Sequence, residues 1–402
     1  MPKYRYTAVN LSGILQTGVI EGSKQSNAEE ILIEKGYYPQ EISLLIEKEK
    51  KGDIEFSKKI KVKDLAIFCN QFAVVLKAGV SILRSLEIMS EQTDDRKLKN
   101  VLENVYEAIQ KGMSVSGAFR EHSERFPEIF LSMLEAGEAS GNLDSSLMRM
   151  GISLTKEYKL NQKVRNAMIY PAVLSVVAVA VVIFLLTVIV PTFSGLYASS
   201  GQQLPLITRM MLGLSSFMSH NILVLILVIL TVVVVARILL RVENIKYSVD
   251  KAKLGLPVIG KLLVKIITAR YTMNMSALLS SGISMVQALD ISSRSVGNTY
   301  VSKGVYSIIN EIRSGKGLTE PLKNLMIFPP MVIQMTQLGE EAGTLDEMLN
   351  QTADFYESEA DSATTKLTTL MEPIIIIFMG GVVLTIVLSI LLPMFGIYNM
   401  IG

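Results

Sequence analysis

Two carboxylate-rich segments of the same form occur about two hundred residues apart in this sequence. GEASGNLD runs from Gly137 to Asp144, and GEEAGTLD runs from Gly339 to Asp346. Acidic side chains can stabilise a helix N-terminus, bind a basic partner or, with enough oxygen ligands, hold a cation. We predict a partner interface at five carboxylates of these segments: Glu138, Asp144, Glu340, Glu341 and Asp346.

Two other interpretations of these segments stay open. Glu138 and Glu340 would cap nearby helix termini, while the glycines would only give backbone freedom where one helix turns into the next. Alternatively, a cation would bridge the carboxylates, although oxygen-rich calcium sites take six or more ligands. We therefore expect no metal site and no cofactor.

Residue patterns that carry enzyme chemistry are absent from the sequence. Gly315-Lys316-Gly317 lacks the upstream glycine and the following hydroxyl of a phosphate-binding loop. No HExxH, GxSxG or paired Cys/His cluster occurs, and the two histidines, His122 and His220, are far apart. The single cysteine, Cys69, is expected to be a small core residue. The sequence predicts no enzyme, so any ATP that drives this protein would be hydrolysed by another chain.

The composition indicates a membrane protein with substantial polar parts. Half of the 402 residues are hydrophobic and 19% are charged, which is more apolar than ordinary soluble proteins. The formal net charge of +2 gives no global basic field for nucleic acid. The first ten residues, MPKYRYTAVN, have no apolar run behind their basic residues, so no secretory signal peptide is expected there.

Three apolar stretches have the length and composition of membrane spans: Ala172 to Val190, Met210 to Ala236 and Ile374 to Leu392. Basic residues are concentrated before the first stretch, between Lys156 and Arg165, and again after the second. The positive-inside rule then places the N-terminus and residues 241–372 in the cytoplasm and the C-terminus outside. The cluster from Lys156 to Arg165 is interpreted as a topology determinant, with lipid recognition as the alternative.

The sequence contains an internal repeat. Pro171 and Pro373 differ by 202 positions, as do Pro191 and Pro393, and the two carboxylate segments keep the same offset. A unit of about 64–193 therefore recurs as 267–395. The middle span has no partner in the repeat and turns the chain round, so both copies would face the same way as a parallel pseudo-dimer. The four prolines are the predicted hinges, with Pro171 as the hinge of a stiff lever that starts at Asp144.

The cytoplasmic copies have the pattern of short helices. Asp64 is the predicted N-cap of the first helix, Ser81 caps the second, and Asp94 or Asp95 caps the third. The predicted structural turns are Gly79, Gly137, Gly141, Gly282, Gly339 and Gly343. Small residues at matched depth in two spans suit close helix packing, or would receive the membrane helix of a partner protein: Ala178, Gly380 and Gly381.

The N-terminal residues form a different kind of segment. Tyr4 to Val9 and Gly18 to Glu21 are expected to be strands around a turn at Ser12-Gly13, followed by a helix from Asn27 to Lys35. The fold class is thus an all-α membrane protein: two duplicated cytoplasmic helical bundles, three transmembrane helices and a small N-terminal α+β module. The predicted domains are the module 1–46, a charged linker 47–63, the first bundle 64–168, span 169–191, external loop 192–209, span 210–238, the cytoplasmic region 241–372 with the second bundle from about 267, span 373–393 and external tail 394–402.

The motifs of both copies resemble a known family. Copy 1 carries FCNQFAVVLKAGVSILRSLE and FPEIFLSMLEAGEASGNLD, and copy 2 carries YTMNMSALLSSGISMVQALD and FPPMVIQMTQLGEEAGTLD, after an N-terminal YxYTAVNxSG. Together they resemble the type II secretion system F family, the inner-membrane platform protein of type IV pilus and type II secretion machines. The resemblance covers essentially the whole chain.

The resemblance implies a non-enzymatic protein of the bacterial inner membrane. Such a platform would couple a cytoplasmic hexameric assembly ATPase to extraction of pilin or pseudopilin subunits. Its partners would be that ATPase, the pilins, other inner-membrane assembly proteins, membrane lipid and further copies of itself. The alternative is the membrane subunit of an ATP-driven transporter of the ABC-permease type, although the apolar stretches 172–190, 222–236 and 374–392 carry no ionisable residue. A scaffold without force coupling is also open.

Overall fold

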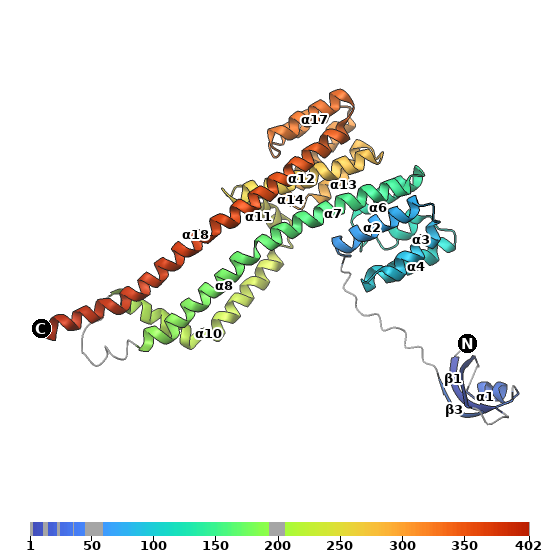
Figure 1. The fold of residues 1–402 in the computed structure, drawn as a ribbon, viewed down its shortest axis with the longest axis horizontal. Coiled ribbons are helices and arrows are strands. Elements are labelled where there is room, and N and C mark those ends of the chain that lie inside the picture. Colours follow the sequence, from blue (N-terminus) through green and yellow to red (C-terminus); the bar gives the residue numbers. More distant parts are fainter. Residues whose placement is uncertain are drawn as a thin grey trace. The chain divides into compact units, whose positions relative to one another are not determined.

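A computed structural model describes residues 3–10, 15–21, 25–34, 36–44, 59–192 and 206–401 (Figure 1). Most of the described residues lie in helices. The chain divides into two compact units, Met1–Lys58 and Lys59–Gly402, which are treated separately below. The expected turn at Ser12-Gly13, most of the linker 47–63, and most of the loop 192–209 lie outside the described residues.

The N-terminal unit is a small antiparallel sheet with one helix. Its strands are β1 (Lys3–Asn10), β2 (Leu15–Glu21) and β3 (Tyr37–Leu44), in the order β2-β1-β3, and α1 (Gln25–Glu34) packs on β3. A bulge interrupts the β1–β3 register between Thr7 and Ala8. β3 is not among the strands expected from the sequence, because Pro39 argues against a strand unless it lies at a sheet edge, where β3 does lie.

Copy 1 consists of α2 (Val62–Lys77), α3 (Ile82–Gln92), α4 (Arg96–Gln110), α5 (Val115–Arg120), α6 (Glu128–Ala139) and α7 (Leu143–Ala167). Ser81 accepts a hydrogen bond from the Arg84 N–H, and Asp95 caps α4, as predicted. The prediction for Asp64 is wrong, because α2 begins two residues earlier. Asp64 lies in its first turn, where a carboxylate stabilises the helix dipole without capping it.

Copy 2 consists of α12 (Ile259–Ser280), α13 (Met285–Ser295), α14 (Thr299–Ser307), α15 (Ile309–Arg313), α16 (Thr319–Asn324), α17 (Pro330–Ala342) and the long α18 (Leu345–Ile401). α11 (Glu243–Leu254) precedes it. α12 packs along α18 as α2 packs along α7, and α17 packs on α18 as α6 packs on α7. One apolar core runs through both copies, and it includes Cys69, which is fully buried as predicted.

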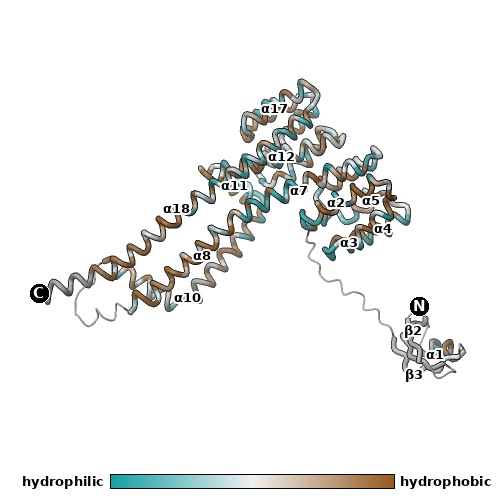
Figure 2. Tube along the Cα trace, viewed as in Figure 1, coloured by the Kyte–Doolittle hydropathy of each residue, from teal (hydrophilic) through white to brown (hydrophobic). Residues whose placement is uncertain are grey.

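Among the residues that the structure describes, two helices are long and apolar enough to cross a membrane: Leu143–Thr192 and Leu345–Leu392. The first comprises α7, α8 (Ile169–Phe184) and a π-helical turn, η1 (Leu185–Ile189). Large apolar side chains on both are exposed, with Val176 at 69% and Ile377 at 75%, which is the pattern of surfaces that face lipid or another helix. Figure 2 shows the apolar runs on α8 and α18.

The middle apolar segment, α10 (Leu206–Leu239), differs from these two. Its backbone is non-helical at Asn221, and shorter apolar runs, Leu206–Met218 and Leu230–Leu239, lie towards its two ends. The Thr208 hydroxyl donates to the Ser389 carbonyl (2.7 Å), and the Ser215 hydroxyl donates to the Leu186 carbonyl (2.5 Å). These bonds, with a small apolar cluster at Leu186, join α10 to the ends of both long helices.

Candidate functional site

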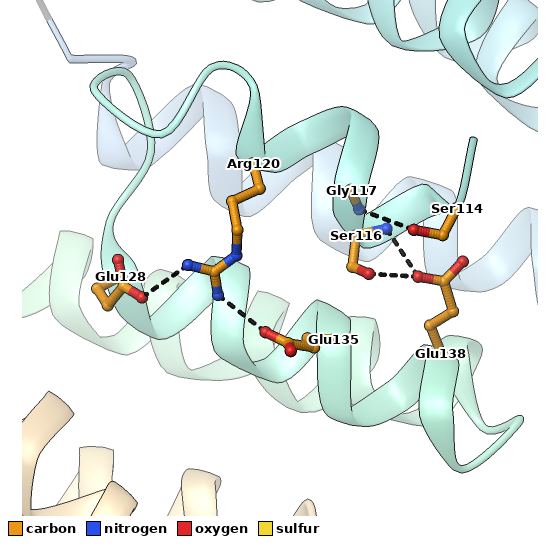
Figure 3. A network of polar contacts seen from close by, with 7 residues as sticks. All are labelled: Ser114, Ser116, Gly117, Arg120, Glu128, Glu135 and Glu138. Atoms are coloured by element: carbon orange, nitrogen blue, oxygen red, sulfur yellow. Dashed lines mark hydrogen bonds and ion pairs between the residues drawn. The ribbon is translucent and has the colours of Figure 1, made fainter.

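Glu138 holds the start of a short helix. It lies in the last turns of α6, and its carboxylate accepts hydrogen bonds from the N–H groups of Val115 (2.6 Å) and Ser116 (2.8 Å) and from the Ser116 hydroxyl (Figure 3). Ser114 adds a conventional cap by accepting from the Gly117 N–H at 3.1 Å. The first N–H groups of a helix have no partner within it, so this carboxylate satisfies donors that α5 leaves open.

Glu340 repeats this arrangement in copy 2. From α17 its carboxylate accepts from the N–H groups of Leu318 and Thr319 (3.0 Å for the latter) and from the Thr319 hydroxyl, at the start of α16. The two matched glutamates therefore have the geometry of the capping interpretation. Glu138 thus joins α5 to α6, which precedes α7, and Glu340 joins α16 to α17, which precedes α18.

The hydrogen bonds also set the charge of Glu138. Burial raises the pKa of its carboxyl, but the bonds from the Ser116 side chain and from the Ser116 and Val115 N–H groups lower it, and the net pKa lies below its ordinary value. The carboxylate form is thus favoured by the fold. A negative charge at the N-terminus of α5 is also favoured by the helix dipole.

The three other predicted interface carboxylates are placed differently. Asp144 and Asp346 lie in the first turns of α7 and α18, half-buried. The Asp346 backbone carbonyl accepts from the Ser276 hydroxyl at 2.7 Å, which ties α18 to α12. Glu341 is exposed on α17 and accepts from the Gln337 side chain at 2.8 Å. Among the described residues there is no group of three or more His, Cys, Asp or Glu side chains that could hold a metal ion.

The repeated glycines have two distinct roles. Gly79, Gly141, Gly282 and Gly343 have positive φ angles of 70–84° at helix ends, the conformation that glycine adopts most readily. The prediction that Gly137 and Gly339 form turns is wrong, because both lie inside helices. A Cβ on Gly339 would lie 2.7 Å from Leu345 Cα, and one on Gly137 would lie 2.7 Å from Ser146 Cβ. Their missing side chains let the next helix approach.

The predicted hinge prolines also differ between the copies. α7 and α8 meet at Met168, three residues before the buried Pro171, whose missing N–H leaves a carbonyl of this turn without its helical donor. The helix that runs from Asp144 into the first apolar stretch thus has a local break in its α-helical pattern at Met168, near the predicted hinge Pro171. α18 continues through Pro373 without interruption. Pro191 lies near the end of the first apolar helix, and the side chain of Pro393 lies outside the described residues.

The small residues of the spans do not pack closely within this chain. A Cβ on Gly380 or Gly381 would meet nothing within 4 Å. Both glycines are exposed and Ala178 is half-buried. Gly380 and Gly381 therefore make no close helix contact within this chain, and both alternatives for them, packing on another helix and receiving a pilin helix, stay predictions.

A ladder of polar contacts between α7–α8 and α18 was missed by the sequence interpretation. Lys156 pairs with Asp354, and Lys163 Nζ lies 2.9 Å from Asp361 Oδ2. The Tyr170 hydroxyl lies 3.5 Å from Glu372 Oε1. Residues 156, 163 and 170 are seven apart, the repeat of paired helices, and the facing residues of α18 are acidic. The seven-residue spacing and the opposite charges are the sequence features from which this ladder could have been predicted.

Copy 1 and copy 2 match the same family domain. Type II secretion system (T2SS), protein F, matches residues 68–191 and again residues 271–393, and the N-terminal domain of that protein matches residues 1–43. The chain belongs to the type II secretion system protein F family. The two matches establish that the repeat is a duplication of the family domain.

Curated relatives of this F-family chain come from both pilus and secretion machines. It is 37% identical to the type IV pilus assembly protein PilC of Thermus thermophilus, over 99% of this chain and 98% of the relative. It is 30% identical to the type II secretion system protein F of Vibrio cholerae, over the full length of both. A PilC of Pseudomonas aeruginosa is 34% identical over 86% of this chain and 92% of its own length.

These relatives make the F-family chain a platform protein of a type IV pilus or type II secretion machine. The family is structural and is not known to be enzymatic. The relatives give no support to the ABC-permease alternative. The two long apolar helices fit a protein of the inner membrane.

Proposed function

We propose that this protein anchors the assembly machine in the inner membrane and couples a cytoplasmic hexameric ATPase to extraction and polymerisation of pilin-like subunits. The observation that carries the proposal is the pair of helices Leu143–Thr192 and Leu345–Leu392. Each begins directly after the helix that carries the capping glutamate of its copy, Glu138 or Glu340, and each ends in an exposed apolar run. Such a helix links a cytoplasmic contact directly to the membrane. Pilin subunits and the ATPase would meet opposite ends of the same element.

The proposed topology has three crossings, with the spans at 169–191, 210–238 and 373–393. The N-terminal module 1–46, the linker 47–63, the first bundle 64–168 and the region 241–372 are cytoplasmic; the loop 192–209 and the tail 394–402 are outside. The basic residues around the spans support this orientation. In a Cys69→Ser background, a cysteine at Ser200 should react with an impermeant thiol reagent in intact cells, and one at Ser248 should not. The reverse labelling would contradict the topology.

Five carboxylates are the proposed contacts to the ATPase or to a second copy: Glu138, Asp144, Glu340, Glu341 and Asp346. A substitution of the exposed Glu341 tests the contact role alone. Substitutions of Glu138 or Glu340 would also remove a helix cap. In cells that lack the native protein, Glu341→Lys should abolish pilus formation or secretion while the protein stays at normal level in the membrane. Normal assembly with Glu341→Lys would remove Glu341 from the interface.

The open face at Gly380 and Gly381 is the proposed contact for the apolar helix of a pilin-like subunit. A glycine surface lets a second helix approach closely, and this face has no neighbour within the chain. Gly380→Leu should reduce co-purification of pilin-like subunits but leave the ATPase bound. Ile376→Leu, an exposed position on the same helix, is the matched control and should change neither.

Pro171, beside the helix break at Met168, is the proposed hinge of a lever that runs from Asp144 into the membrane. Cysteines at Tyr170 and Glu372, whose side chains already touch, can be joined by a short bifunctional reagent in the Cys69→Ser background. Joining them should stop assembly, and reduction of a cleavable reagent should restore it. Assembly that continues with the link in place would contradict the lever.

A further inference from the structure

Copy 2 has an open groove between α16 and α17. It encloses about 690 Å³ and is lined, among others, by Glu320, Lys323, Phe328, Ile333, Gln337 and Glu341. Phe328 forms a buried wall, while Glu320, Lys323, Gln337 and Glu341 are exposed at its rim. The groove thus has an apolar interior and a polar edge, which is the usual composition of a site that holds a peptide side chain.

The corresponding place in copy 1 is bridged by an arginine. Arg120 of α5 reaches across to α6, where its guanidinium lies 3.3 Å from Glu128 Oε1 and 2.8 Å from Glu135 Oε2 (Figure 3). One planar guanidinium that meets two carboxylates fixes the spacing of α5 and α6. Copy 1 is therefore locked at this point by its own side chains.

Copy 2 has lost every partner of this lock. Lys323 replaces Arg120 at an offset of 203, the offset that also relates Ser116 to Thr319. At the offset of 202, Pro330 replaces Glu128 and Gln337 replaces Glu135. Neither Pro330 nor Gln337 carries a charge, and in the described part of the chain Lys323 makes no ion pair. The repeat nevertheless keeps the Glu340 cap, so the helices are held in the same arrangement while the space between them stays open.

The charges at the rim define what the groove attracts. Glu320 on α16 and Glu341 on α17 are exposed carboxylates of the lining, and the Glu340 carboxylate accepts hydrogen bonds at the start of α16. Lys323 is the single cation among the residues that line the groove. Met326, in the loop between α16 and α17, is 92% exposed and adds apolar surface. The groove is acidic at its edge and apolar inside.

We infer that this groove binds a segment of a partner protein that carries a lysine or arginine next to an apolar side chain, and that copy 1 does not bind it. The basic group would lie between Glu320 and Glu341, and the apolar group would pack on Phe328 and Ile333. This inference rests on the proposed partner interface, to which Glu340 and Glu341 belong. It adds that the two copies are unequal: copy 1 is closed by Arg120, and copy 2 takes the partner.

Site-specific photo-crosslinking of the full-length protein in native membranes tests the inference. A benzophenone amino acid is placed at Gln337 and, as the control in copy 1, at Ala139, an exposed residue of α6 that takes no part in the lock. We expect an adduct from position 337 whose cross-linked peptide, read by mass spectrometry, contains a basic residue beside an apolar one, and at least tenfold less adduct from position 139. An adduct of position 337 to lipid, to an acidic segment or to nothing, or equal adducts from both positions, would overturn it.

Two variants separate specific binding from general charge. Glu320→Lys with Glu341→Lys should reduce the adduct at position 337 at least tenfold. Glu91→Lys with Glu103→Lys makes the same change of charge at exposed positions of copy 1 and should leave the adduct unchanged. Equal loss in both double variants would overturn the inference, because it would show a long-range effect of charge.

Transfer of the copy 1 lock to copy 2 should close the groove with side chains that the protein already uses at the matched positions of copy 1. Lys323→Arg, Pro330→Glu and Gln337→Glu reproduce the three residues of the lock, and the photo-crosslinker is then read from Gln334. The graft should lower the adduct at least tenfold while the protein keeps its melting temperature; an undiminished adduct would contradict the inference.

If the ATPase co-purifies with the unaltered protein but no adduct forms, the groove inference fails and the proposed function stands. If the adduct forms but neither ATPase nor pilin-like chains co-purify, the proposed function fails instead.

Discussion

Lys163 Nζ on α7 lies 2.9 Å from Asp361 Oδ2 on α18, one heptad beyond the pair of Lys156 and Asp354. The two helices descend from different copies of one duplicated domain, yet one presents lysines and the other presents aspartates. Pairing copy 1 with copy 2 joins opposite charges at both positions. The ladder therefore favours the contact between the two copies and keeps their membrane-entering helices in register.

The first prediction concerns this ladder. Lys163→Asp or Asp361→Lys alone should lower the thermal stability, because each puts two like charges in contact, and the double exchange should restore most of it. Exposed pairs of this kind contribute roughly 0.2–1 kcal/mol. The coupling energy from the double-mutant cycle in detergent-solubilised protein is the measurement. A coupling of zero, with both single variants as stable as the parent, would show that the pair contributes nothing to the helix contact.

The second prediction concerns the Glu138 cap. Glu138→Ala removes the acceptor of three hydrogen bonds and should destabilise copy 1 by about 2 kcal/mol, while Glu138→Gln should cost less, since its amide oxygen still accepts. Cys69 is fully buried and is the single cysteine of the chain, so a thiol-reactive dye reports the opening of this core. An unchanged labelling temperature in Glu138→Ala would contradict the cap.

The third prediction is the pH dependence of the same cap. The folded-state pKa of Glu138 is lowered, so its contribution is complete above the unfolded pKa of about 4.3 and is lost as the pH falls through the lower folded value. The stability difference between the parent and Glu138→Gln should thus be constant above about pH 5 and shrink below about pH 4. Dye labelling of Cys69 across this range measures it. A difference that grows on acidification would have the wrong sign.

The fourth prediction concerns the helical glycines. Gly339→Ala puts a methyl group 2.7 Å from the Leu345 Cα and should destabilise copy 2 by roughly 1–3 kcal/mol. Gly137→Ala puts a methyl group 2.7 Å from the Ser146 Cβ, whose position is fixed by the backbone, and should destabilise copy 1 by a similar amount. Gly380→Ala, with open space around it, is the control. Equal melting temperatures for the three variants would show that neither hairpin depends on its glycine.

Local chemistry made much of this fold predictable. Ser81, Asp95 and Gly79 mark helix ends by side-chain or backbone properties that act over a few residues, and each has the predicted place. The N-cap prediction for Asp64 was wrong because acidic residues are favoured both at the N-cap and in the first turn of a helix, so the residue type does not distinguish the two positions. Gly137 and Gly339 were misassigned because a glycine needed for close approach and one needed for a turn are the same residue type.

Long-range contacts of the candidate site were less predictable. Glu138 meets Val115 across 23 positions, and Lys163 meets Asp361 across 198. Neither contact follows from local propensity, because it depends on how helices pack. The repeat gave the stronger signal: once one copy is known, the second follows, and the positions where the copies differ, such as Arg120 and Lys323, are the informative ones.

The central claim is that this F-family chain is a platform that links an assembly ATPase to pilin-like subunits. Affinity purification of the tagged protein from native membranes, with every co-purifying chain identified by mass spectrometry, tests it most directly. The account predicts a hexameric ATPase with a phosphate-binding loop and short single-span pilin-like proteins, whose identity would name the machine. Recovery of an ABC-type nucleotide-binding subunit with a solute-binding protein, and no pilin-like chain, would contradict it.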